Sequence, residues 1–161
     1  MELIVAVGLF ALVMVLASGA YLVMLGMNRQ TQAVATGINN LSFALETMTR
    51  TIRTWTDYGC PTYGTNCPTG GTVFSVKNTS GTTMTYALAG GVITQNGIAL
   101  TDPPPAITVS SLMFYATGTA KGDGQQPHVT IIVSGTVSTG AGKPLETFSV
   151  ETGATMRGTD I

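Results

Sequence analysis

The stretch that decides the fold is Met1–Gln30, MELIVAVGLFALVMVLASGAYLVMLGMNRQ. From Leu3 to Met27 it contains no charged residue. As a helix, this segment would be about 37 Å long, which exceeds the thickness of a bilayer's hydrocarbon core. A signal peptide has a shorter apolar core behind basic residues. A fully buried core helix would need a larger soluble remainder around it. The stretch therefore predicts a membrane-spanning helix over residues 1–27, with one carboxylate, Glu2, at its tip.

The rest of the chain has the composition of a domain in water. All seven prolines follow Cys60, and residues 28–161 are rich in Thr, Ser and Gly. The whole chain of 161 residues has room for one domain with an appended helix. Only 9% of its residues are charged and its net charge is −1, so overall charge gives no argument for binding nucleic acid.

An amphipathic pattern continues the apolar run without a helix breaker. Seven apolar residues recur at alternating spacings of four and three, which places them on one face of a helix. Glu46 and Arg50 form a favourable i,i+4 pair, and Gly59 is the expected stop of a helix that reaches about residue 56. A coiled coil would carry charges beside the stripe, whereas this helix carries Thr, Asn and Gln there. We therefore expect residues 28–56 to pack on a sheet through Val34, Ile38, Leu41, Leu45, Met48, Ile52 and Trp55.

The second half of the chain reads as β structure. Between residues 72 and 157, short segments rich in Val, Ile, Thr, Phe and Tyr are separated by turn residues. Short connections favour an antiparallel sheet of about five or six strands with one face covered by the amphipathic helix. The predicted fold class is α+β: one long N-terminal helix, then a cysteine loop over residues 57–71, then the sheet over residues 72–157.

The two cysteines, Cys60 and Cys67, lie in YGCPTYGTNCPTGG. One intrachain bridge between them would close a small loop and add about 2–3 kcal/mol of stability. Such a bridge needs an oxidising compartment. Free thiols are the alternative, and a structural metal is disfavoured because His128 is the only histidine and stands far away. The oxidising compartment that the bridge needs conflicts with the position of Arg29. This residue follows the apolar run, and on charge alone it would place the domain in the cytoplasm. A short basic leader ahead of residue 1 would remove that conflict.

The opening ELIVAVGLFALVMVLASGAYL, a glutamate ahead of a long apolar helix with an antiparallel sheet behind it, resembles type IV pilins and type II secretion pseudopilins. The ending FSVETGATMR is similar to minor subunits of the J or W type. The resemblance implies a leader cut and methylated by a prepilin peptidase, then assembly on a membrane platform into a filament. It also implies that Glu2 neutralises the N-terminal amine of a neighbouring subunit. The chain departs from the family because only Met1 precedes Glu2 and no leader glycine is present. Hydration of Glu2 at the headgroup level is the alternative.

These observations predict a structural, minor subunit of a pilus-like or type II secretion filament, and not an enzyme. Its expected partners are other pilin or pseudopilin subunits and inner-membrane lipid, with no cofactor, metal or nucleic acid. The domain is expected outside the cytoplasm, on a single-pass anchor before assembly. A monomeric membrane-anchored binding module is the alternative. A catalytic His128, a calcium loop at Asp123, and a nucleic-acid surface of Arg50, Arg53, Trp55 and Tyr58 are all disfavoured, because each lacks the companion groups it would need.

Overall fold

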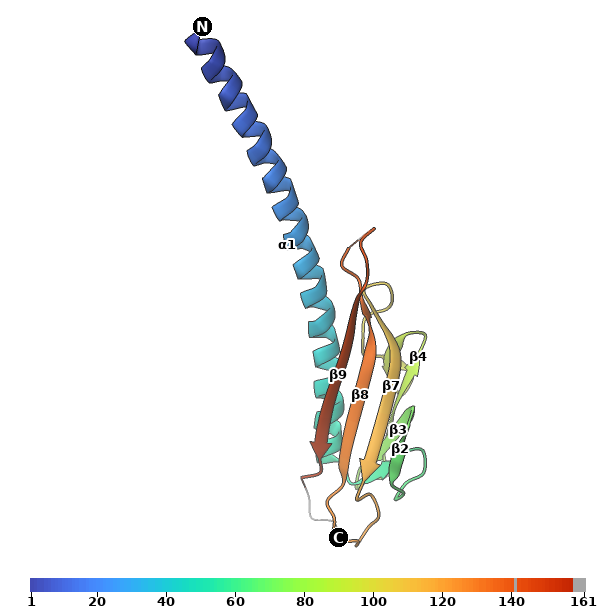
Figure 1. The fold of residues 1–161 in the computed structure, drawn as a ribbon. Coiled ribbons are helices and arrows are strands. Elements are labelled where there is room, and N and C mark those ends of the chain that lie inside the picture. Colours follow the sequence, from blue (N-terminus) through green and yellow to red (C-terminus); the bar gives the residue numbers. More distant parts are fainter. Residues whose placement is uncertain (141, 158–161) are drawn as a thin grey trace.

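A computed structural model describes residues 1–140 and 142–157. One helix leads the chain and nine strands follow it in the described residues, so the predicted α+β fold class is confirmed (Figure 1). The elements are α1 (Glu2–Thr54), β1 (Asp57–Gly59), β2 (Cys67–Gly71), β3 (Val73–Lys77), β4 (Thr83–Ala89), β5 (Val92–Gln95), β6 (Ile98–Ala99), β7 (Ile107–Thr117), β8 (His128–Val137) and β9 (Glu146–Thr155).

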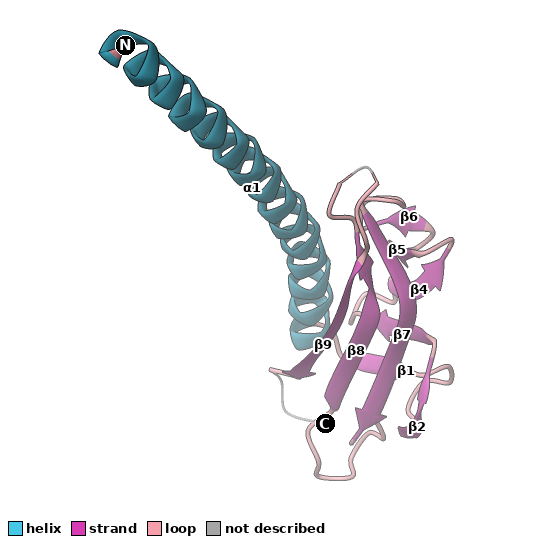
Figure 2. Cartoon of the chain, turned by 45° about the horizontal axis from the view of Figure 1, so that its top comes forward, coloured by secondary structure: helices cyan, strands magenta, loops and turns pink. Residues whose placement is uncertain are grey.

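Helix α1 is continuous over 53 residues, a length of about 80 Å. Its N-terminal half projects away from the strands, and its C-terminal half lies against β8 and β9 (Figures 1 and 2). Four members of the predicted stripe are buried, while Val34, Ile38 and Trp55 are half-buried at its margins. The buried four are Leu41, Leu45, Met48 and Ile52.

The strands form two antiparallel sheets rather than the one predicted. Their orders are β1-β3-β4-β5-β6 and β2-β7-β8-β9. The sheets meet beside β7, where the backbone N–H of Val109 donates to the Gly91 carbonyl at 2.8 Å. The number of strands, nine, exceeds the expected five or six for two reasons. Strands β1 and β2 were not predicted, and one predicted strand divides into β5 and β6. That division is the turn at Asn96-Gly97, where both residues have positive φ, as a tight hairpin requires.

The predicted boundaries around the cysteines need correction. Residues 57–71 were expected to form a loop, but they contain β1 and β2. Gly59 does not end the helix, because it belongs to β1. The helix ends two residues earlier than expected, at Thr54, and Trp55 already has an extended backbone. Short strands in a segment rich in Pro and Gly carry too few alternating residues to be recognised by pattern.

The core lies between α1 and the inner faces of the two sheets. Three aromatic rings connect the sheets: Phe74 of β3 stacks on Tyr58 of β1 and on Phe114 of β7, with ring centroids 6.2 and 5.1 Å apart. Strand β8 is buried at every second residue from Val129 to Val137, as expected for a strand with one face toward the core. This packing fixes the direction in which α1 leaves the domain.

Candidate functional site

The N-terminal part of α1 is an uncovered apolar rod. Every residue from Met1 to Met24 is exposed, including large side chains such as Leu9 (67% exposed), Phe10 (62%) and Leu22 (67%). By length and composition, α1 is the one helix in the described residues that is suited to cross a membrane. Monomeric soluble proteins rarely expose an apolar surface of this extent, so the rod requires lipid or another protein around it. Residues 2–27 are called the apolar rod below.

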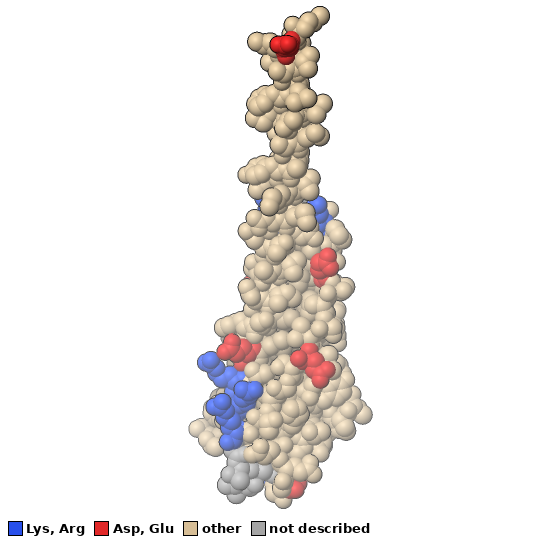
Figure 3. Space-filling model, turned by 60° about the vertical axis from the view of Figure 1, so that its left-hand side comes forward, with Lys and Arg blue, Asp and Glu red and all other residues tan. Residues whose placement is uncertain are grey.

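Glu2 stands at the free tip of the apolar rod, in the first turn of α1. Figure 3 shows an isolated acidic group there, far along the molecule from the other charged side chains. A carboxylate in this position is stabilised by the positive end of the helix dipole while it is hydrated. In hydrocarbon it costs several kcal/mol unless a cation pairs with it.

The rod is held to the domain by a close approach of α1 to β8. Gly37 is buried, and a Cβ added to it would lie 2.6 Å from Cγ1 of Val137. One turn further along α1, the side-chain oxygen of Asn40 accepts a hydrogen bond from the Asp102 backbone N–H at 2.8 Å. The sequence did not predict either residue. A glycine inside a helix only lowers the helix propensity of that segment and does not indicate a close contact, and Asn40 lies outside the apolar stripe.

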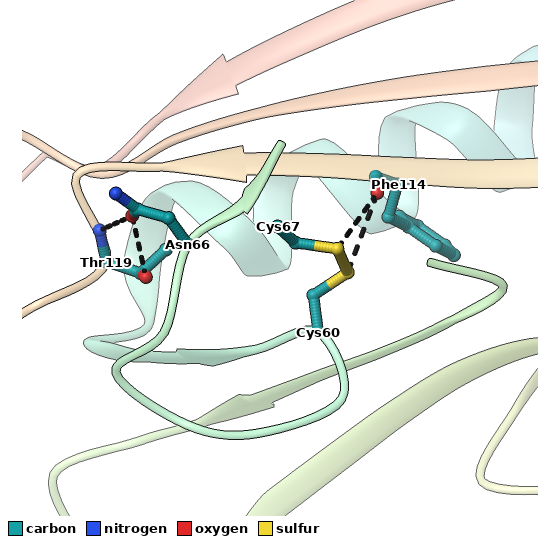
Figure 4. Close-up of a disulfide and its surroundings, with 5 residues drawn as sticks. All are labelled: Cys60, Asn66, Cys67, Phe114 and Thr119. Carbon is teal, nitrogen blue, oxygen red and sulfur yellow. Dashed lines mark hydrogen bonds between the residues drawn. A yellow bond between two sulfur atoms is a disulfide. The ribbon is translucent and has the colours of Figure 1, made fainter. Parts of the chain in front are cut away.

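The predicted bridge between Cys60 and Cys67 is confirmed, with the two Cα atoms 5.8 Å apart. Both cysteines are buried, and their sulfurs lie 3.5 and 3.7 Å from the Phe114 carbonyl oxygen (Figure 4). Asn66 in the same loop accepts hydrogen bonds from the backbone N–H and the hydroxyl of Thr119. Because Cys60 follows β1 and Cys67 begins β2, the bridge ties the edge strands of the two sheets together.

An open groove continues from the apolar rod between α1 and the start of β9. It has a volume of about 790 Å³. Met27, Val34 and Ile38 form its apolar floor, and Glu146 and Thr147 lie across from them. The groove extends the apolar character of the rod onto the domain, where a neighbouring chain or a lipid tail could contact both at once.

His128 and Asp123, the remaining candidates from the sequence, each have a hydrogen-bond partner within the domain. His128 is exposed, and its Nδ1 lies 3.0 Å from the Thr155 hydroxyl. Asp123 accepts a hydrogen bond from the Gln125 backbone N–H at 2.8 Å. Within residues 1–140 and 142–157, no three His, Cys, Asp or Glu side chains lie close enough to hold a metal.

The four residues considered as a nucleic-acid surface do not face the same way. Arg50 and Arg53 are exposed on α1, but Tyr58 is fully buried and burial raises the pKa of its phenol. Its hydroxyl donates toward the Ile52 and Trp55 carbonyl oxygens at 2.5 and 2.8 Å. Tyr58 is therefore a core residue at the end of α1 and offers no ring for a base to stack on.

Comparison with family models, curated proteins and solved structures finds no match to this chain. The observed arrangement, a long N-terminal apolar helix packed on antiparallel sheets, is consistent with a pilin-like architecture. The apolar rod suggests a membrane anchor or a signal segment, and the disulfide points to an extracytoplasmic domain.

Proposed function

We propose that this chain is a structural subunit of a type IV pilus-like or type II secretion filament. The observation that carries the proposal is the uncovered apolar rod, continuous with a helix half that is fixed to a β domain. The resemblance of residues 2–22 to pilins and pseudopilins supports it, and the similarity of the ending FSVETGATMR to J-type and W-type subunits favours a minor subunit. In this account the rod lies in inner-membrane lipid first and then packs against the rods of neighbouring subunits.

The two surroundings proposed for the rod are energetically similar for its apolar residues and different for Glu2. Leu, Val and Phe side chains lose little when lipid tails are exchanged for other apolar helices. A carboxylate loses its hydration in either medium, and only a cation of a neighbouring subunit offsets that cost. We propose that Glu2 selects the axial alignment in which such a cation is adjacent to it.

We further propose that the chain works by assembly rather than by catalysis. Its partners would be other pilin or pseudopilin subunits, with a prepilin peptidase and an assembly platform implied by the resemblance. The Cys60–Cys67 bridge supports a domain outside the cytoplasm on a single-pass inner-membrane anchor, and then a periplasmic or surface filament.

The Glu2→Ala variant of the full-length chain tests this function in its native envelope. We expect unchanged recovery in the membrane fraction, because removing a carboxylate from the apolar end of a helix does not raise the free-energy cost of inserting that helix into lipid. We expect about a tenfold lower yield in the sheared filament fraction. The cation of the neighbouring subunit would lose its carboxylate partner, and an unpaired charge in an apolar core costs well over 1 kcal/mol.

Asp102→Ala is the matched control, because Asp102 is an exposed carboxylate in a loop of the domain. It should leave both fractions unchanged. Equal filament yields for Glu2→Ala and the wild-type chain would contradict the role of Glu2. A chain that stays monomeric in the envelope would instead support a membrane-anchored binding module.

A further inference from the structure

Three arginines meet at the C-terminal end of α1. Arg50 and Arg53 come from the helix, and Arg157 follows β9. The Arg157 backbone N–H donates to the Arg53 carbonyl oxygen at 3.1 Å, which fixes the two chain segments side by side. With Glu46, Thr49 and Thr54, the three arginines line a hollow of about 220 Å³. We call Arg50, Arg53 and Arg157 the arginine surface.

Among residues 1–140 and 142–157, the arginine surface carries an excess of positive charge. Glu46 lies 3.5 Å from the Arg50 guanidinium, so one described carboxylate accompanies three cations in the hollow. Both members of that pair are largely exposed, at 71% and 79% of the side chain, so water screens their attraction. Three of the seven Lys and Arg residues of a sparsely charged chain are gathered here. A guanidinium group is well suited to bind a carboxylate, because it can donate two parallel hydrogen bonds to the two carboxylate oxygens.

A complementary acidic element lies elsewhere on the same domain. Strand β9 is the edge strand of its sheet and carries two exposed carboxylates, Glu146 and Glu151. Figure 3 shows Lys and Arg side chains low on one side of the domain, with acidic side chains beside them and toward the other side. Because Glu151 precedes Arg157 by six residues along the path of β9, its carboxylate is also displaced from the arginine surface along the direction of that strand.

That displacement fits a contact between identical chains. Copies that pack in parallel through their rods are related by a rotation and a shift along the rod, so different faces of neighbouring copies meet. We propose that the arginine surface binds Glu151 on strand β9 of a second copy of this chain. This inference rests on the proposed filament function, because it requires the rods of the two copies to lie in parallel.

Cross-linking between two differently tagged full-length copies in their native envelope tests the contact. One copy carries Thr54→Cys, beside the arginine surface, and the other carries Ser149→Cys, two residues before Glu151 on the same strand. We expect a short bismaleimide reagent to join the two tags. Arg53→Glu in the first copy, or Glu151→Arg in the second, should lower that yield about fivefold. The two reversals together should restore it.

Two controls identify the origin of the effect. Lys143→Glu makes the same charge change at an exposed loop residue and should leave the yield unchanged. Asp160→Asn should also leave it unchanged. A loss with Asp160→Asn equal to the loss with Glu151→Arg would show that Glu151 is not the specific partner of the arginine surface, and would overturn the inference.

A third pair of copies, each with Val13→Cys in the apolar rod, reports rod packing on its own. Cross-linked rods without any Thr54–Ser149 product, or a product that is insensitive to both reversals, would refute the arginine contact and leave the filament function standing. Failure of the Val13 pair as well would refute both. Joining of the Thr54 variant to a different protein alone would show that the acidic partner is not a second copy.

Discussion

The side chain of Tyr58 caps the C-terminal end of α1, although Tyr58 itself belongs to β1. The last carbonyl groups of a helix have no partner within the helix, so other groups must satisfy them. The Thr56 backbone N–H, which could serve Ile52, donates instead to the Lys77 carbonyl oxygen. The buried Tyr58 hydroxyl takes its place and is directed at both the Ile52 and Trp55 oxygens. One side chain thus anchors β1 beneath the end of α1.

Tyr58→Phe should destabilise the full-length chain by about 1–2 kcal/mol, because it leaves buried carbonyl oxygens without a donor. Chemical unfolding in detergent micelles, followed by near-ultraviolet circular dichroism, measures the change. Tyr63→Phe is the matched control, since Tyr63 is 41% exposed, and should change stability little. Equal stability of the wild-type and Tyr58→Phe chains would show that the hydroxyl does not cap the helix.

The same residue gives stability a dependence on pH. Burial raises the pKa of the Tyr58 phenol above its unfolded value, so the folded state prefers the neutral form. Its contribution is complete below about pH 10, the unfolded pKa, and is lost as the pH rises further. Tyr58→Phe should therefore lose less stability between pH 9 and 11 than the wild-type chain, as compared in the same unfolding experiment.

At the scale of elements, the contact between α1 and β8 depends on Gly37. A Cβ at this position would meet Val137 at 2.6 Å, a distance at which one of the two must move. Gly37→Ala should therefore cost about 1–3 kcal/mol despite the higher helix propensity of alanine. Unfolding of the full-length chain in micelles measures this cost.

Two further variants separate the close approach from other causes. In Gly37→Ala/Val137→Ala the clash is relieved, so the double variant should be more stable than the sum of the single losses by about 1 kcal/mol. Gly26→Ala places a methyl group where no atom lies within 4 Å and should not destabilise the chain. Strict additivity of the two single changes would mean that the helix and β8 are not held in contact at this point.

The sequence was most informative where a pattern is local. The spacing from Val34 to Trp55 predicted the buried face of α1, because residues three and four apart share a helix face. Local composition predicted the longer strands, since Val, Ile, Thr, Phe and Tyr are enriched in strands and turn residues separate the segments. The fold class followed from the helical spacing, from this composition and from the length of the apolar run.

Pairing between distant segments could not be read in the same way. Strand β1 pairs with β3 and β2 pairs with β7, so two neighbouring short strands join different sheets. Nothing in three or five residues specifies that choice, which depends on the packing of Phe74 and Phe114 and on the Cys60–Cys67 bridge. The arginine surface was missed as a group of three for the same reason, because Arg157 reaches α1 only through the path of β9.

The whole molecule is a β domain packed on one half of a helix whose other half is uncovered. Helix α1 links the apolar rod to the domain without interruption, since it is one element from Glu2 to Thr54. Forces on the apolar rod are therefore transmitted to the sheets through the contacts at Gly37 and along Leu41, Leu45 and Met48. This continuity supports the proposal of a filament subunit whose domain keeps its orientation while the rod changes its surroundings.

Cross-linking through the apolar rod tests the central claim most directly. Full-length chains with Val13→Cys in their native envelope should form a product with another subunit, because the account places neighbouring rods in contact along this segment. Adding Glu2→Ala should lower the yield of that product while the chain remains in the membrane. A Val13→Cys chain that stays uncross-linked and monomeric, although its thiol reacts with a monofunctional maleimide, would contradict the account.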